Sequence, residues 1–188
     1  LNHRYSDDLD FFVNDRKDFN RQVEIVLKAF KSNEITAEIS VTGDSFARVF
    51  IKDKEALLKI DFVNDISYRT GQSVVTGLFI RTDNIFNILS NKISALARYS
   101  AKDVADIFFI ALNYGFNWVD IMREASEKDI WVNAVDVCKI LDEFPVEQLD
   151  ELVWVESLND KYSFKSKLAT LIKDLLTGST NTIVGDKK

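Results

Sequence analysis

Apolar and polar residues alternate in several short runs of the first half of the chain, a pattern typical of β-strands that bury one face. Residues 8–13 read acid, apolar, acid, apolar and then turn wholly apolar, which predicts a strand with one face at a site. Apolar residues then recur at helical spacing between Asp18 and Lys31, so an amphipathic helix should follow. Three runs rich in β-branched and aromatic residues predict a meander of strands over residues 34–41, 46–52 and 56–63.

After Thr82 the apolar residues recur at helical spacing, which indicates a helical region. Five helices are predicted, at about residues 84–99, 102–113, 117–127, 132–143 and 161–176. One more short strand is expected at residues 78–81, and a frayed tail from Gly178 to the end. The predicted fold class is α+β, with a mixed sheet domain over residues 1–82, a helical domain over 83–177 and a flexible tail over 178–188.

Composition narrows the function without deciding it. The 188 residues are 46% hydrophobic and carry a net charge of −6, which argues against broad affinity for the phosphates of nucleic acid, although a local basic patch stays open. The sequence has no apolar run of about 18 residues, so no membrane association is expected. The single cysteine, Cys138, favours a reducing, cytoplasmic location and is most simply a small buried hydrophobe.

The acids of the first predicted strand are the first candidate site. A strand places Ser6, Asp8 and Asp10 on one face, with Leu9 and Phe11 on the other. Carboxylates about 7 Å apart along a strand repel each other unless a cation lies between them, and a hard divalent cation such as Mg²⁺ or Mn²⁺ suits oxygen ligands. A solvated strand face is the alternative reading of this motif.

A third acid interrupts a strongly apolar strand. Ile60 and Phe62 should face a core, which leaves Asp61 on the opposite face. If this strand lies beside the first, three carboxylates meet, which is the ligand set of a two-metal site for phosphoryl transfer. The alternative is an edge-strand aspartate that faces water.

The motifs resemble a known family. His3-Arg4, Ser6, Asp8-Leu9-Asp10-Phe11-Phe12 and Lys59-Ile60-Asp61-Phe62 resemble the abortive-infection nucleotidyltransferases typified by the AbiEii and AbiGii toxins. The resemblance extends through Asn91-Lys92-Ile93, Ala95-Leu96, Arg98 and Ala101-Lys102-Asp103 to Asp106, and so covers about residues 3–115. It implies a nucleotidyltransferase-type sheet of the DNA polymerase β-like superfamily. It also implies transfer of a nucleotide from a nucleoside triphosphate to an acceptor, which in the toxin members can be RNA, often tRNA.

The resemblance also implies roles for single residues. Asp8 and Asp10 would bind the metal ions, and Asp61 would be the third metal-binding acid and help to deprotonate the acceptor hydroxyl. Lys92 would bind or orient the nucleotide, and Asp103 would complete the site, although a solvated lysine and an acid that stabilises a helix N-terminus are the structural alternatives. Arg4 and Ser6 could contact phosphate, but they and His3 could equally be structural, and His3 is given no catalytic role.

The chain departs from the family in one respect. Members carry a glycine-rich turn upstream of the His-Arg element, whose amides bind the phosphates, and no such turn precedes Leu1. Because the sequence also starts without methionine, we expect that an N-terminal segment is missing.

Three functions follow from these observations. The first is a metal-dependent nucleotidyltransferase, a toxin or phage-defence component restrained by a cognate antitoxin. The second is a catalytically degenerate version of this fold that binds a protein partner, for which Trp118, Trp131 and Trp154 could form an apolar surface, although core packing explains them more simply. The third, a hydrolytic metal enzyme that uses the same acids, ranks last.

Overall fold

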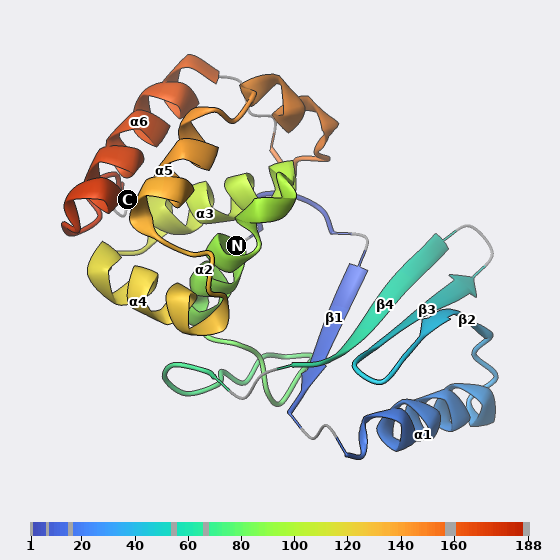
Figure 1. Ribbon diagram of the computed structural model, residues 1–188. Helices are drawn as coiled ribbons and strands as arrows, with labels where there is room; N and C mark the ends of the chain where they lie inside the picture. Colours follow the sequence, from blue (N-terminus) through green and yellow to red (C-terminus); the bar gives the residue numbers. More distant parts are fainter. Residues whose placement is uncertain are drawn as a thin grey trace. The chain divides into compact units, whose positions relative to one another are not determined.

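The computed structural model describes residues 2–6, 8–14, 17–53, 56–65, 68–156 and 161–185 (Figure 1). The chain forms two compact units, one of Ser6–Ser67 and one that combines Leu1–Tyr5 with Tyr68–Lys188. The predicted domain limits at residues 82 and 177 stay predictions.

The first unit is a four-stranded mixed sheet with one helix. Its elements are β1 (Asp8–Val13), α1 (Phe19–Ser32), β2 (Ala37–Thr42), β3 (Phe46–Asp53) and β4 (Ala56–Asn64). The strand order is β1-β4-β3-β2, with β1 parallel to β4 and the other neighbours antiparallel. The predicted helix and all four strands of this unit are confirmed within a few residues.

One face of this sheet packs against α1. Phe19 and Val23 of the helix are buried with Val49, Ile60 and Phe62 of the sheet, because Ile60 and Phe62 are two residues apart in β4 and so point to one side, as does Val49, the partner of Ile60. Lys59 and Asp61 therefore lie on the opposite face of β4, as was predicted for Asp61.

The second unit is helical apart from its loops. Its elements are α2 (Ile85–Ser94), η1 (Leu96–Arg98), α3 (Ala101–Asn113), α4 (Trp118–Lys128), α5 (Ala134–Asp142), η2 (Val146–Glu151) and α6 (Lys161–Thr177). The five predicted helices are confirmed, but the first is shorter than expected. It gives way to the 3-10 turn η1, which ends at Tyr99 in the left-handed conformation (φ 54°).

The strand expected at residues 78–81 is wrong. The described backbone there forms bends, and the only pairing nearby is an isolated bridge between Val74 and Thr82. Leu78 and Ile80 are 87% and 83% exposed, so these residues bury no face against a sheet. An apolar run without a neighbouring strand gains nothing from extending the ladder.

The core of the second unit contains the three tryptophans and the single cysteine. Trp118 is fully buried, and Trp131 and Trp154 pack against the same core, which supports core packing for the three tryptophans rather than an exposed apolar surface. Cys138 is buried as predicted, and burial raises the pKa of its thiol to about 11.

The segment after α6 packs on the helices up to Gly185, in place of the frayed tail that was expected from residue 178. Nδ2 of Asn181 donates to the carbonyls of Ala111 and Tyr114 at 2.7 and 2.8 Å, and Ile183 is buried. These bonds satisfy carbonyls at the C-terminal end of α3, which lack partners within the helix.

Among the described residues, no helix combines the length and apolarity needed to cross a bilayer.

Candidate active site

The three candidate aspartates, Asp8, Asp10 and Asp61, lie on one face of the sheet. Asp10 of β1 is the register partner of Asp61 of β4, and Asp8 is the partner of Lys59. Since residues two apart along a strand share a face, Asp8, Asp10, Lys59 and Asp61 all project away from α1. The predicted adjacency of the two acid-bearing strands is confirmed.

Two basic side chains contact these acids. The guanidinium of Arg48, on β3 directly opposite Asp61, donates from Nε and Nη2 to the two carboxylate oxygens of Asp61, both at 2.7 Å. The ammonium of Lys59 lies 2.9 Å from Oδ2 of Asp8. Ser6 also donates a hydrogen bond to Oδ1 of Asp8 at 2.6 Å, so Asp8 is held from two sides.

The electrostatics link all five charged groups. The hydrogen bonds to Asp61 raise the pKa of Arg48 above its usual range, and the charges of Asp10 and Asp8 act in the same direction. The hydrogen bond to Asp8 raises the pKa of Lys59, the charge of Asp61 adds to this effect, and the charge of Arg48 opposes it. We name Asp8, Asp10, Asp61, Arg48 and Lys59 the acidic face of the sheet.

The donor chemistry of the acidic face fits a hard divalent cation, because its oxygen donors are three carboxylates on adjacent strands. As the side chains stand, however, no three His, Cys, Asp or Glu residues in the described part of the chain are placed to hold a metal ion. Arg48 and Lys59 hold two of the three carboxylates. A bound cation would therefore have to take the place of these basic groups.

A second charged cluster lies in the helical unit around Asp103. Asp103 is fully buried in the first turn of α3 and accepts two hydrogen bonds from Arg98, at 2.6 and 2.8 Å. Lys92 of α2 lies 3.2 Å from the same carboxylate. Complete burial with two basic partners accounts for Asp103 as a structural acid that joins α2, η1 and α3.

Asp106, one turn further along α3, anchors the start of the chain. Arg4 donates to its two oxygens, both at 2.8 Å, and Nε2 of His3 lies 3.0 Å from Oδ1. Lys92 completes the set at 2.8 Å from Oδ2. Burial alone would raise the pKa of Asp106, but the hydrogen bonds to His3 and Arg4 and the charge of Lys92 outweigh it and hold this pKa well below its usual range.

These contacts give His3 and Arg4 a structural role. The ring of His3 stacks on Phe109 at 4.5 Å between centroids, and the amide of Tyr5 donates to Val153, so residues 3–5 are fixed on the helical unit. The roles of Arg4, Ser6, Lys92 and Asp103 in binding or catalysis stay predictions.

Sequence reasoning missed Arg48 and Lys59 as members of the site. Lys59 lies two residues before Asp61 and so shares its parity, and Arg48 lies opposite Asp61 in the antiparallel pair. The spacing of Lys59 and Asp61 could have been recognised in the sequence, but Arg48 could be placed beside Asp61 only from the pairing register of β3 with β4.

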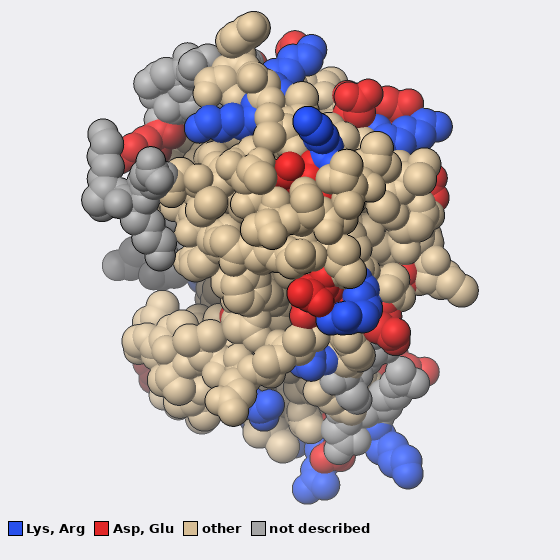
Figure 2. Space-filling view, turned by 90° about the vertical axis from the view of Figure 1, so that its left-hand side faces the viewer, with Lys and Arg blue, Asp and Glu red and all other residues tan. Residues whose placement is uncertain are grey.

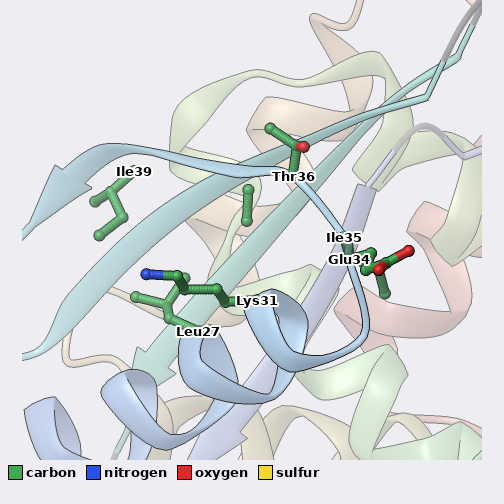
Figure 3. A pocket seen from close by; sticks show the side chains of 7 residues that line it. Leu27, Lys31, Glu34, Ile35, Thr36 and Ile39 are labelled. Atoms are coloured by element: carbon green, nitrogen blue, oxygen red, sulfur yellow. The ribbon is translucent and has the colours of Figure 1, made fainter.

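Two cavities are lined by residues that do not belong to the acidic face. The first, of about 400 Å³, is bounded by the end of α1 and the start of β2, where Leu27 and Lys31 of the helix face Ile39 of the strand (Figure 3). Ile39 pairs with Val49, so this cavity opens on the helix side of the sheet. The second, of about 450 Å³, belongs to the helical unit and is lined by Phe86, Phe116 and the buried Glu124, among others.

The described basic side chains are scattered over the surface drawn in Figure 2. On the face drawn in Figure 2, the described Lys and Arg side chains lie singly or beside acidic ones, without one continuous basic area. The described residues in this view therefore form no broad basic track for nucleic-acid phosphates.

Comparison with known proteins identifies the fold. No family model and no curated protein sequence matches the chain. A solved structure from H. pylori, of a protein assigned as a nucleotidyltransferase, aligns over 93% of this chain and 80% of its own, with a TM-score of 0.58 and 22% identity. MenT4, a nucleotidyltransferase toxin from Mycobacterium tuberculosis H37Rv, aligns over 92% of this chain and 70% of its own, with a TM-score of 0.51 and 12% identity. The chain therefore has an α+β, nucleotidyltransferase-like fold.

Proposed function

We propose that the protein is a metal-dependent nucleotidyltransferase that transfers a nucleotide from a nucleoside triphosphate to an acceptor hydroxyl, with RNA as the acceptor. The observation that carries the proposal is the pairing of Asp10 with Asp61 on adjacent strands of this fold, with Asp8 on the same face. Like charges placed directly opposite each other destabilise a sheet, so their presence here points to a function.

In this proposal Asp8, Asp10 and Asp61 hold Mg²⁺ or Mn²⁺. These ions would supply charge neutralisation and a more acidic acceptor hydroxyl. The acceptor oxygen forms a bond to the α-phosphorus, the bond from that phosphorus to the pyrophosphate oxygen breaks, and Asp61 receives the hydroxyl proton. Ser6 orients Asp8 through its 2.6 Å hydrogen bond. For Lys92 and Asp103 of the helical unit, a part in the reaction rests on the motif resemblance alone.

The biological role is also a proposal. The motif resemblance to the AbiEii and AbiGii toxins and the structural likeness to MenT4, a nucleotidyltransferase toxin, support a toxin or phage-defence component with a cognate antitoxin. The alternative is a degenerate protein of the same fold that acts as a protein-interaction module.

Calorimetric titration with Mn²⁺ tests the metal site. The unaltered protein should bind Mn²⁺, and Asp10→Asn should lose the binding by about tenfold or more, because one of the three carboxylates is removed. Asp44→Asn, at an exposed position of the turn between β2 and β3, is the matched control and should bind normally. Equal binding by the unaltered protein and the Asp10 variant would refute this site.

Incubation with labelled nucleoside triphosphates and total RNA tests the reaction itself. Label should appear in RNA with the unaltered protein and should be lost with Asp10→Asn. Metal binding without any transfer to RNA, DNA, protein or small acceptors would favour the degenerate alternative.

A further inference from the structure

The acidic face contains two cations that the proposed metal site does not use. Arg48 and Lys59 come from adjacent antiparallel strands, and Lys59 lies two residues before Asp61, the direct partner of Arg48. Diagonal neighbours of this kind have Cβ atoms roughly 7 Å apart, within reach of long side chains. Both cations can therefore meet one ligand above the sheet.

Their present partners suggest what that ligand is. Arg48 makes a planar two-point contact with the oxygens of Asp61, a geometry that a phosphate offers equally well. The side chain of Arg48 is 35% exposed and that of Lys59 is 28% exposed, so neither side chain is enclosed by the protein. Both are therefore open to a polyphosphate.

The charges of the acidic face favour a change of partners for Arg48 and Lys59 when a metal ion binds. Among the five charged groups of the acidic face, the three carboxylates outnumber the two basic groups, so without a metal ion their summed charge repels a triphosphate. Divalent cations bound to the carboxylates would reverse the sign of the face and release Arg48 and Lys59 from Asp61 and Asp8. The released side chains would then meet the anion that arrives with the metal.

We propose that Arg48 and Lys59 bind the phosphates of the nucleoside triphosphate, and that without metal they occupy the carboxylates of Asp61 and Asp8. This inference rests on the proposed function and adds two substrate-binding residues to it. It also makes Arg48 and Lys59 competitors of the metal ion.

The test compares two titrations of the same variants. In the first, Mn²⁺ alone is titrated into Arg48→Gln and Lys59→Gln, which should bind it about threefold or more tighter because the competing cation is gone. In the second, inorganic triphosphate is titrated in the presence of saturating Mn²⁺, and both variants should bind it about tenfold or more weakly. Tighter metal binding with weaker triphosphate binding is the expected signature.

Lys52→Gln is the matched control, because Lys52 is an exposed lysine of β3 on the same face as Arg48 and further along the strand. It should leave both titrations unchanged. Arg48→Lys keeps the positive charge but cannot make the two-point contact, so it should retain part of the triphosphate affinity. This variant also provides the test if Arg48→Gln does not fold.

The outcomes separate the two proposals. Weaker Mn²⁺ binding together with weaker triphosphate binding would mean that Arg48 and Lys59 only support the sheet, and would overturn the inference. Unchanged triphosphate binding would overturn it as well, while Mn²⁺ binding that depends on Asp10 would leave the proposed function standing. No Mn²⁺ binding by the unaltered protein would overturn both.

Discussion

Asp10 and Asp61 stand directly opposite each other on two neighbouring parallel strands, and Arg48 approaches the pair from the third strand. Asp10→Asn removes one of two like charges, so it should slightly stabilise the metal-free protein, by about 1–3 °C in Tm. Differential scanning calorimetry in the presence of a chelator measures this, with Asp44→Asn as the control. A lower Tm would show that the Asp10 carboxylate contributes to folding.

Asp106 joins the start of the chain to two helices, so its replacement should be costly. Asp106→Asn weakens the contacts with His3, Arg4 and Lys92 and leaves partly buried cations with a neutral partner. A loss of about 3–5 kcal/mol in the free energy of unfolding is expected from urea denaturation. Asp120→Asn, on an exposed ion pair with Arg123, should change it by less than about 1 kcal/mol. A similar effect in both variants would contradict the structural role of Asp106.

The lowered pKa of Asp106 predicts that the fold loses stability in acid. Because the pKa of Asp106 is lower in the folded protein than in the unfolded chain, the unfolded state takes up its proton first as the pH falls. The stabilisation is therefore complete above about pH 4 and decreases as the pH is lowered further, towards the folded-state pKa. Urea midpoints between pH 6 and pH 2.5 measure this. Asp106→Asn should show a shallower decrease than the unaltered protein, and parallel curves would exclude Asp106 as the source.

Asn181 should contribute measurable stability although it follows the last helix. Asn181→Ala leaves the carbonyls of Ala111 and Tyr114 without the amide donor, at a position that is 3% exposed. The expected loss is about 1–3 kcal/mol in the free energy of unfolding. Asn113→Ala, whose amide contacts Phe109 from an exposed position, is the control. An unchanged unfolding curve for Asn181→Ala would mean that the segment does not dock in solution.

Replacement of Glu124 by glutamine should stabilise the protein, in contrast to the loss expected for Asn181→Ala. The side chain of Glu124 is buried in α4, and Oε2 has no hydrogen-bond partner among the described residues, as is also true of Nδ2 of Asn87. Glu124→Gln removes a buried charge at nearly constant volume, so a gain of about 1–2 kcal/mol in the free energy of unfolding is expected. The exposed Glu127→Gln is the control. Destabilisation by Glu124→Gln would instead indicate that a bound water or ligand satisfies this carboxylate.

Local patterns predicted the elements and the two faces of the sheet, because alternation in β4 and helical spacing in the second half depend only on neighbouring residues. The position of Asp61 opposite the core followed from Ile60 and Phe62 alone. Partners distant in sequence could not be read in this way. His3 and Asp106 are 103 residues apart, and the docking of Asn181 on α3 spans 70 residues. Such pairs are set by tertiary packing, which a single sequence does not encode in its periodicity.

The strand order β1-β4-β3-β2 has a consequence for biosynthesis. The hairpins of β2, β3 and β4 join consecutive segments, whereas β1 must wait for a partner that leaves the ribosome about fifty residues later, and closing so long a loop carries an entropic cost. Among the four strands of this sheet, β1 is therefore made first and completes its pairing only after β4 has been made. Asp10 meets Asp61 only in this final step, so the nascent chain cannot assemble its three carboxylates before the sheet is complete.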